Sequence, residues 1–566
     1  MNRKLPDVGE LLKQALAFHQ QGLLNDAKRL YEEILKAIPD HFDALHLLGV
    51  IAFQTANNSE AARFISRSLQ ISPLNSTALL NYGNVLKELK RHEEALASYD
   101  KAIAIRAGYA NALSNRGVVL KELKRHEEAL ASYDKAIAIR PDYADAHYNR
   151  GNVLQELKRH EEALASYDKA IAIKPDDVDT LTGRGNALKE LKRHEEALAS
   201  YDKAIAIKPD DADTLFNRGV VLQELKRHEE ALASYDKAIA IKPDDAKVHL
   251  NESICRLLIG DFARGWSKFE WRWQDKQLKE SRRSFPQPLW LGEQPVLGKT
   301  ILLHEEQGVG DTLQFVRYIK DVAGLGATVL LAARTSLKPL LNDIDGVSQL
   351  ICQGEPLPPF DYHCPLLSLP LAFKTEIDTI PSQVPYLQSN PKLLAQWQAK
   401  INNKHFPRVG IAWSGSHLHE NDRNRSIPLG KMAPLASGNI SLVSLQKEVR
   451  AEDQDVLDAH KEILHFGEEL KDFGDTAALI DCLDLVISVD TSVAHLAGAL
   501  GKPVWILLPY NPDWRWLLDR EDSPWYPTAR LFRQARMEDW DSVIQRVIQE
   551  MSSLFPLPHN LPHSSK

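Results

Sequence analysis

The chain has 566 residues, 44% of them hydrophobic and 26% charged, and it carries a formal net charge of −8. This length exceeds what one hydrophobic core supports, so we expect two to four domains. The acidic balance argues against a general nucleic-acid binder, which needs a basic face.

Two further features bear on the compartment in which the protein works. No apolar run approaches membrane-spanning length, and the first residues lack the apolar core of a signal peptide. The cysteines lack the paired spacing of a zinc site or a disulfide framework; they are Cys255, Cys352, Cys364 and Cys482. We therefore expect reduced core cysteines and a cytoplasmic protein without a transmembrane segment.

Residues 1–245 consist of repeated segments. The motif LKRHEEALASYDKAIAI begins at Leu89 and returns every 34 residues, at Leu123, Leu157, Leu191 and Leu225. A helix–turn–helix period of 34 residues is the signature of tetratricopeptide repeats. Small residues recur at one position of each first helix, and a proline follows most second helices, as helix pairing and termination require. We predict seven repeats that form an α solenoid, and a degenerate, aromatic-rich capping repeat with a linker over residues 246–290.

One polar position recurs on the first helix of the repeats. An asparagine stands two residues before the small residue at five places, and Gly183 interrupts a row formed by Asn81, Asn115, Asn149, Asn217 and Asn251. A row of amides suits the backbone of an extended polypeptide, so these are candidates for binding a protein or peptide on the concave face. The alternative is that each asparagine satisfies neighbouring helix groups inside the array.

Residues 291–405 and 406–566 alternate short apolar strands with helices, which indicates two lobes built on parallel sheets. In the first lobe we expect strands at 300–305, at 327–332 and near Asp361, with a glycine loop at 307–311 and a helix at 312–322. In the second we expect strands at 408–413, 440–445, 485–489 and 504–508. Asp490, Thr491 and Ser492 precede a helix at the carboxyl edge of a strand, where backbone N–H groups favour an anion.

The residues of these lobes carry a family resemblance. The glycine loop Gly308-Val309-Gly310-Asp311 and the block SVDTSVAHLAGALGKPV at 488–504 resemble the heptosyltransferase-like GT-B glycosyltransferases of family 9. The loops at 413–428 and 444–447 look like the same family's intervening segments. Tetratricopeptide repeats joined to two such lobes also resemble the architecture of protein O-GlcNAc transferases. The resemblance implies a GT-B fold of two Rossmann-like lobes that binds a nucleotide-sugar diphosphate at the 488–504 block.

The resemblance also implies roles for particular residues. Asp311 matches the family's proposed base, although it can instead cap the following helix; Glu305 and Glu306 are alternative bases. Arginines, a lysine and N–H groups are suited to hold a departing diphosphate. The expected donor-binding residues are Gly308, Gly310, Trp413, Arg423, Arg425, Lys447, Asp490, Thr491, Ser492 and His495.

The spacing of His417 and His419 suggests a metal site, but no third ligand stands out. GT-B enzymes usually work without bound metal, so we expect no metal and no cofactor, with the nucleotide-sugar as substrate.

These features predict an inverting glycosyltransferase that moves a sugar from a nucleotide-sugar donor to a protein, peptide or glycan recruited by the repeats. The alternative is a non-catalytic interaction scaffold with a degenerate transferase domain. Neither the donor base and sugar nor the acceptor can be read from the sequence, because variable loops make those contacts.

Overall fold

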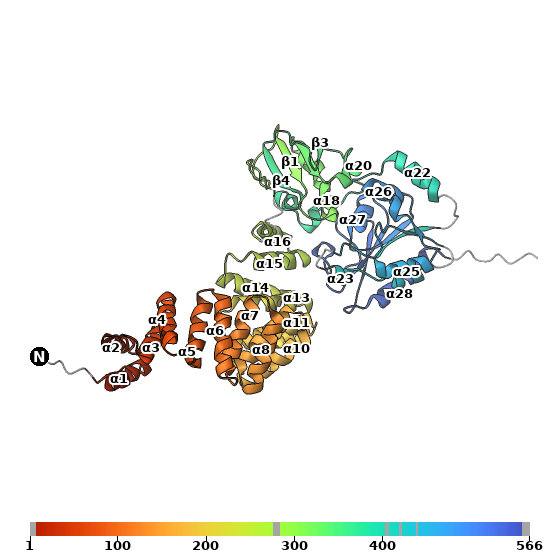
Figure 1. The fold of residues 1–566 in the computed structure, drawn as a ribbon. Helices are drawn as coiled ribbons and strands as arrows, with labels where there is room; N and C mark the ends of the chain where they lie inside the picture. Colours follow the sequence, from red (N-terminus) through yellow and green to blue (C-terminus); the bar gives the residue numbers. More distant parts are fainter. Residues whose placement is uncertain (1–6, 276–282, 402–406, 418–420, 437–439, 557–566) are drawn as a thin grey trace, which may run out of the picture. The chain divides into compact units, whose positions relative to one another are not determined.

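A computed structural model describes residues 7–275, 283–401, 407–417, 421–436 and 440–556. The chain divides into two compact units, Met1–Leu225 and Lys226–Lys566. The first is helical and the second is mostly α/β (Figure 1). The division falls inside the seventh repeat, between its first and its second helix.

The first unit is a regular succession of paired helices, which confirms the predicted α solenoid. Each repeat supplies a first helix of 13 residues and a second of 14. The helices are α1 (Val8–Gln20), α2 (Leu24–Ala37), α3 (Phe42–Gln54), α4 (Asn58–Ile71), α5 (Ser76–Glu88), α6 (His92–Ile105), α7 (Ala110–Glu122), α8 (His126–Ile139), α9 (Ala144–Glu156), α10 (His160–Ile173), α11 (Val178–Glu190), α12 (His194–Ile207) and α13 (Ala212–Glu224).

The small residue of the first helix is needed in several repeats because a tyrosine ring packs against it, and in the second repeat Ile65 packs against Gly49 instead. A Cβ atom on Gly83 would lie 2.4 Å from Cε1 of Tyr99, and one on Gly151 would lie 2.6 Å from Cε1 of Tyr167. Both tyrosines are fully buried. The repeated glycine therefore lets the two helices of a repeat approach closely enough to bury the ring between them.

Each first helix is followed, two residues after its end, by a residue with a positive φ angle, 34 residues from the next such residue. Lysine occupies this left-handed position at Lys90, Lys124, Lys158, Lys192 and Lys226 with φ of 59–60°. Glycine occupies it in the outermost repeats, at Gly22 and Gly260.

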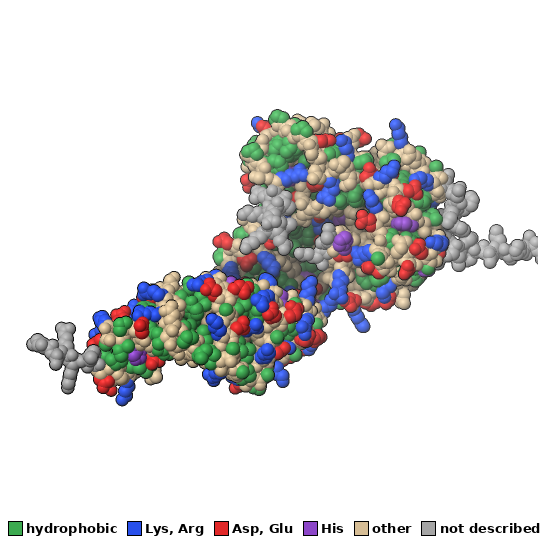
Figure 2. Space-filling view, viewed as in Figure 1, with side chains coloured by type: hydrophobic (Ala, Val, Ile, Leu, Met, Phe, Trp, Pro, Cys, Tyr) green, Lys and Arg blue, Asp and Glu red, His purple; other side chains and the backbone are tan. Residues whose placement is uncertain are grey.

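Acidic and basic side chains intermingle over the face of the repeats seen in Figure 2, so this face carries no single-sign patch.

The second unit begins with the end of the array, α14 (His228–Ile241), α15 (Ala246–Leu258) and α16 (Phe262–Phe269). The aromatic residues of α16 pack on the α/β lobes. The ring of Trp266 lies 5.2 Å from that of Trp514, and its indole N–H donates to the carbonyl of Thr375 at 3.0 Å. The degenerate repeat therefore covers part of the lobes' core, as predicted for a cap.

The first lobe contains one parallel four-stranded sheet of order β3-β2-β1-β4. Its strands are β1 (Thr300–His304), β2 (Thr328–Ala333), β3 (Val347–Cys352) and β4 (Tyr362–Pro365). Its helices are α18 (Val309–Phe315), α19 (Ile319–Gly324), α20 (Lys338–Leu341) and α21 (Leu369–Ala372), and α22 (Pro391–Ile401) leads to the second lobe. The expected helix at 312–322 starts earlier, at Val309, and a short 3-10 turn interrupts it.

The second lobe contains a parallel six-stranded sheet of order β10-β9-β8-β5-β6-β7. Its strands are β5 (Arg408–Ala412), β6 (Ser441–Ser444), β7 (Leu464–His465), β8 (Leu485–Val489), β9 (Val504–Leu508) and β10 (Ala529–Arg533). Its helices are α23 (Asp422–Arg425), α24 (Leu429–Met432), α25 (Ala451–Ala459), α26 (Phe473–Asp481), α27 (Ser492–Ala499) and α28 (Trp540–Leu554). The strand order reverses between β5 and β8, and open α/β sheets bind ligands at the carboxyl ends of such strands.

Candidate active site

The site centres on the turn after β1, where α18 begins. Gly308 is the N-cap residue, and its N–H donates to Oδ2 of Asp311 at 2.7 Å, so this carboxylate caps the helix. Because the helix starts at Val309, Asp311 stands in its first turn and not on a loop. Its other oxygen, Oδ1, accepts a hydrogen bond from Arg515 of the second lobe.

Arg515 joins the two lobes. Besides Asp311, its guanidinium donates to Oε1 of Gln314 at 2.7 Å and to Oδ1 of Asp513 at 2.8 Å. It also lies 4.4 Å from the centre of the Trp514 ring. Burial opposes the charge of Arg515, but the carboxylates of Asp513 and Asp311 outweigh burial and raise its pKa. The arginine is therefore a fixed positive charge between acidic groups.

Asp490 follows β8 at the switch point of the second sheet. Burial, and then the neighbouring charge of Asp513, raise the pKa of Asp490 to about 6, although Trp516, Arg515 and Arg425 oppose the shift. The carbonyl of Asp490 accepts a hydrogen bond from Nη1 of Arg425 at 2.9 Å. Arg425 thus reaches the strand end that sequence reasoning connected to a diphosphate.

His495 lies on the first turns of α27 and is 5% exposed. Its Nδ1 lies 2.9 Å from the Tyr526 hydroxyl, and its Nε2 lies 3.9 Å from Oδ1 of Asp490. The ring stacks on Trp516 at 5.4 Å. Burial, and then the positive charge of Arg515, lower the pKa of His495 well below its usual value, so the imidazole is neutral.

The two predicted halves of the site meet at Gly310. A Cβ atom there would lie 2.8 Å from Cδ2 of His495, so only a glycine lets α18 pack this closely on α27. The structure therefore brings together Gly308, Gly310, Asp311, Arg425, Asp490 and His495. Helix α27 begins at Ser492, and the buried Thr491 is its N-cap residue. Oγ1 of Thr491 lies 3.2 Å from Oγ of Ser488.

The alternative bases are engaged elsewhere. Glu305 accepts a hydrogen bond from Arg334 at 2.9 Å. Glu306 accepts two bonds from Arg272, both at 3.0 Å, and burial raises its pKa against the effect of that arginine. Arg272 belongs to the short 3-10 turn after α16, so Glu306 serves the junction between the cap and the first lobe.

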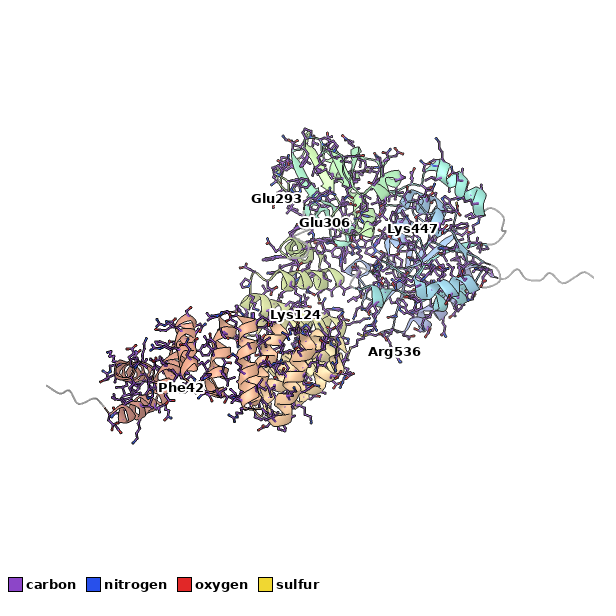
Figure 3. All side chains as sticks on the ribbon, viewed as in Figure 1. Phe42, Lys124, Glu293, Glu306, Lys447 and Arg536 are labelled. Atoms are coloured by element: carbon purple, nitrogen blue, oxygen red, sulfur yellow. The ribbon has the colours of Figure 1, made fainter. Side chains whose placement is uncertain are left out.

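Of the other predicted donor-binding residues, Trp413 and Lys447 have side chains engaged elsewhere, and Arg423 is exposed. Trp413 is fully buried and its indole N–H donates to Oδ2 of Asp453 at 2.9 Å, so its side chain belongs to the core. Nζ of Lys447 donates to the carbonyl of Lys471 at 3.0 Å, and Arg423 is exposed. Figure 3 labels Glu306 and Lys447, which lie on different lobes. The geometry therefore does not support a donor-binding role for Trp413 or Lys447.

Several of the asparagines use their amides inside the array. Nδ2 of Asn81 lies 3.0 Å from Nε2 of His46, and Nδ2 of Asn115 donates to Asn84 at 2.8 Å. Nδ2 of Asn251, in the second unit, donates to the carbonyl of Lys247 at 2.9 Å. Asn149 and Asn217 are half-buried.

At Gly183, where the row is interrupted, the Tyr167 ring lies close to the backbone, and a Cβ atom would lie 2.9 Å from it. In the neighbouring repeats an asparagine occupies the position equivalent to Gly183 beside an equivalent tyrosine, as Asn149 does 16 residues after Tyr133.

The described residues contain no group of three or more His, Cys, Asp or Glu arranged to hold a metal ion. His417 lies within them, whereas His419 lies outside the described residues. Among the same residues, no helix is long and apolar enough to cross a membrane. The four cysteines are buried and unpaired.

Sequence reasoning missed Arg515, Asp513, Trp516 and Tyr526. The signal that could have found three of them is the polar and aromatic run NPDWRW, residues 511–516, which follows β9 at the same carboxyl edge as Asp490. A parallel sheet places such strand ends side by side.

Known protein families match both halves of the chain. Family models described as TPR repeat or tetratricopeptide repeat match residues 12–76, 83–124, 119–158, 144–177, 185–226 and 212–245. A model described as glycosyltransferase family 9 (heptosyltransferase) matches residues 470–516. That segment contains Asp490, His495 and Arg515.

Individual proteins resemble parts of the chain. Protein FlbA of Caulobacter vibrioides is 26% identical over 324 residues, which cover 51% of this chain and 52% of FlbA. The chain thus spans about half the length of the curated relative that it matches. Among solved structures, YrrB, a TPR protein with an unusual peptide-binding site, is 27% identical at a TM-score of 0.30 and covers 32% of this chain and 95% of its own. MamA is 25% identical at a TM-score of 0.28, and the match covers 29% of this chain and 97% of MamA.

Proposed function

Because this chain is a tetratricopeptide-repeat protein fused to a glycosyltransferase-like domain, we propose that it is an inverting, metal-independent glycosyltransferase of the GT-B type. Its donor is a nucleotide-sugar, and its acceptor is a protein, peptide or glycan recruited by the repeats. The observation that carries the proposal is the contact between the lobes, in which Arg515 holds Asp311 while His495 packs on Gly310.

In the proposed reaction, Asp311 removes the proton of the acceptor hydroxyl as its oxygen attacks the anomeric carbon. The bond between that carbon and the diphosphate oxygen breaks, and the diphosphate leaves with the electron pair. The guanidinium of Arg425 and the N–H groups at the start of α27 stabilise the departing charge. Arg515 keeps the Asp311 carboxylate directed toward the second lobe.

The neutral ring of His495 fits the same scheme. In the tautomer that accepts the Tyr526 hydroxyl at Nδ1, Nε2 carries the proton and faces Asp490. In this tautomer the Nε2–H group is available to donate a hydrogen bond to a ligand at the tip of α27, and the ring need not be charged. A neutral donor in a buried position avoids the cost of desolvating an imidazolium.

Nucleotide binding is tested first. UDP, GDP, ADP and CMP are compared by thermal shift, since a ligand that binds only the folded state raises the melting temperature. The nucleotide that binds then identifies the donor series for a transfer assay. Addition of EDTA is expected to leave turnover unchanged.

The role of Asp311 is tested by Asp311→Asn, which keeps an oxygen to cap Gly308 but cannot take a proton. We expect turnover to fall by roughly 10²–10⁴-fold, the usual contribution of a general base, with nucleotide affinity unchanged. Glu305→Gln is the matched control and should retain turnover. Loss of turnover in Glu305→Gln together with full activity of Asp311→Asn would move the base to Glu305.

The diphosphate contact is tested by Arg425→Ala, with the exposed Arg423→Ala as the matched control. A desolvated charge-assisted contact contributes about 2 kcal/mol, so the Kd of the nucleotide should rise by about 30-fold in the first variant only. Equal affinities of the two variants, measured by calorimetry, would remove Arg425 from the site.

A second candidate is a non-catalytic scaffold. One observation favours it: both carboxylate oxygens of Asp311 already accept hydrogen bonds, from Gly308 and from Arg515. A scaffold would show neither transfer nor hydrolysis with any nucleotide-sugar of the panel, even where the parent nucleotide binds.

A further inference from the structure

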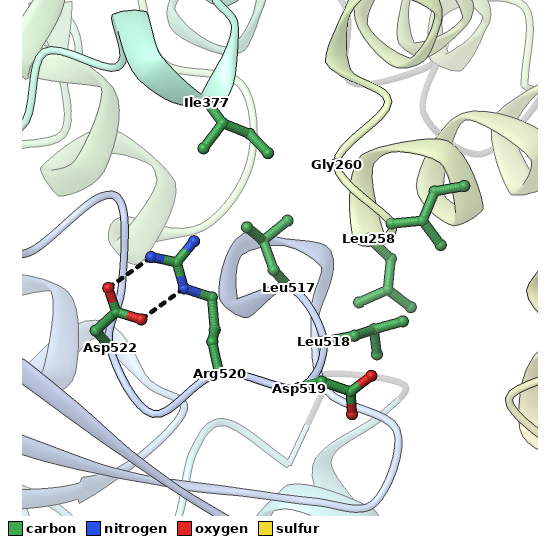
Figure 4. A pocket seen from close by; sticks show the side chains of 9 residues that line it. Leu258, Gly260, Ile377, Leu517, Leu518, Asp519, Arg520 and Asp522 are labelled. Atoms are coloured by element: carbon green, nitrogen blue, oxygen red, sulfur yellow. Dashed lines mark hydrogen bonds and ion pairs between the residues drawn. The ribbon is translucent and has the colours of Figure 1, made fainter.

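A cavity of about 510 Å³ lies within the second unit (Figure 4). Three separate segments line it: the turn between α15 and α16, a short 3-10 turn of the first lobe, and the segment that directly follows Trp516. Its apolar lining comes from Leu258, Ile259, Gly260, Ile377, Leu517 and Leu518. Its volume is in the range of ligand pockets.

The wall after Trp516 is held in an unusual conformation. Leu517 has φ 53° and ψ −166°, and Asp519 has φ 50°, both costly for residues other than glycine. Arg533 on β10 keeps this wall in place by donating to three of its carbonyls: Trp516 at 2.5 Å, Leu517 at 3.0 Å and Arg520 at 2.8 Å. The shape of the wall is thus set by a dedicated side chain.

The charged residues that line the cavity are Asp519, Arg520 and Asp522. Arg520 donates twice to Asp522, at 2.8 and 2.6 Å. Asp519 lies in the field of Lys226 and Arg533. Because Arg520, the cation of the lining, is already paired with Asp522, and the two lining carboxylates leave the lining with one net negative charge, the cavity disfavours a phosphate or a carboxylate. The complementary occupant is an uncharged apolar group.

We propose that this cavity binds an aliphatic side chain of the acceptor polypeptide. This rests on the proposed function, in which the repeats recruit a polypeptide. One wall belongs to the last, degenerate repeat, and another continues the segment that carries Arg515. A polypeptide passing from the repeat to Asp311 would place a residue here, so the cavity selects acceptors that carry Leu, Ile or Val near the modified residue.

The test uses the full chain and three small probes: the N-acetyl amides of leucine, asparagine and glutamate. Their affinities are measured by ligand-observed NMR titration. The leucine amide is expected to bind at least about tenfold more tightly than the other two, the discrimination typical of an apolar pocket. Equal affinities, or a preference for the glutamate amide, would overturn the proposal.

Matched variants tie the binding to this cavity. Ile259 and Ile71 are both 40% exposed at the end of a helix, but only Ile259 lines the cavity. Ile259→Asp is expected to weaken leucine-amide binding about tenfold, whereas Ile71→Asp leaves it unchanged. Undiminished binding to Ile259→Asp would place the leucine site elsewhere. If this variant melts well below Ile71→Asp, then Ile259→Ser replaces it.

Nucleotide binding separates the two proposals. Binding of a nucleotide without any leucine preference overturns the subsite and leaves the transferase proposal standing. A leucine preference that disappears in Ile259→Asp, together with no binding of any nucleotide, overturns the transferase proposal and leaves a polypeptide-binding pocket.

Discussion

Arg150 of the array and Arg515 of the second unit each join several partners, but these partners lie at different distances along the chain. Arg150 donates to Asp134 and to Ser166, each 16 residues away and both at 2.7 Å. Arg515 reaches Asp311 and Gln314, 204 and 201 residues away. The side chain of Arg150 is 24% exposed and that of Arg515 is 10% exposed.

The difference shows how each unit is stabilised. The array repeats one modest, half-exposed contact from repeat to repeat, so no single contact decides its fold. The second unit concentrates several buried charges at one place, and the removal of one partner leaves the others uncompensated. The units can be followed separately, because all 11 tryptophans lie after residue 225 and their fluorescence reports only the second unit.

The largest expected effect is that of Arg515→Ala. Breaking a buried charge network costs roughly 3–5 kcal/mol, so tryptophan fluorescence should show the second unit unfolding at much lower guanidinium concentration. Arg150→Ala, the control, should lower the stability of the array by less than about 1 kcal/mol, measured by circular dichroism. Similar losses from both variants would contradict the contrast between the units.

Next is Asp490→Asn, whose effect depends on pH. The folded-state pKa of Asp490 is raised to about 6, above the usual value of 3.8. The folded state therefore binds the proton more tightly than the unfolded state, and Asp490 costs stability as pH rises from about 4 to 6. Relative to wild type, the free energy of unfolding of Asp490→Asn should be higher by about 2–3 kcal/mol at pH 7, and this difference should not grow further above pH 7. A gain that is constant from pH 4.5 to 8 would rule out this titration.

A smaller effect is expected from Gly151→Ala in the array. The added Cβ would meet the ring of Tyr167, which its hydroxyl fixes by hydrogen bonds of 2.7 Å to Asn152 and 2.8 Å to Gln155. This overpacking should lower the free energy of unfolding of the array by about 1–3 kcal/mol. At Gly108 a Cβ meets nothing within 4 Å, so Gly108→Ala should be neutral in the same thermal melt. An equal loss in both variants would exclude the contact with Tyr167 as the cause.

The smallest expected effect per site is an increase in the stability of the array. Replacing Lys124 by glycine, which adopts positive φ without strain, should stabilise the array by about 0.5–1 kcal/mol. The same change at Lys90, Lys158 and Lys192 should add nearly independently, because these sites are far apart. Lys135→Gly, inside α8, should instead lose about 1 kcal/mol. Destabilisation by all these substitutions would show that the turn lysines contribute more than backbone conformation.

The array could be predicted almost completely, because its rules are local. The 34-residue period, the small residue that accepts a tyrosine ring and the turn after each first helix all act within one or two repeats. The sequence also predicts most strands of both lobes, but not β3, β7 and β10, which are partly exposed, very short or interrupted by arginines, so their apolar signal is weak.

The candidate site was predicted only in part. Asp311 and His495 were singled out on two separate segments, and they do lie on the two helices that meet at Gly310. The sequence predicts that Trp413 binds the donor, yet its ring lies in the core. A tryptophan at the end of a strand gives the same sequence pattern whether it faces a ligand or the core. Arg515 was missed because its importance comes from its partners and not from its neighbours in the chain.

By itself, then, the sequence determined the repeat number, the α/β character of the second half and the polar strand ends at which a ligand can bind. These follow from hydrogen bonding and burial within a few tens of residues. Only the tertiary structure decided that Arg515 meets Asp311, that the last repeat shares a cavity with the segment after Trp516, and that the boundary falls at residue 225. Those outcomes depend on the path of the chain through the whole unit, which no local pattern specifies.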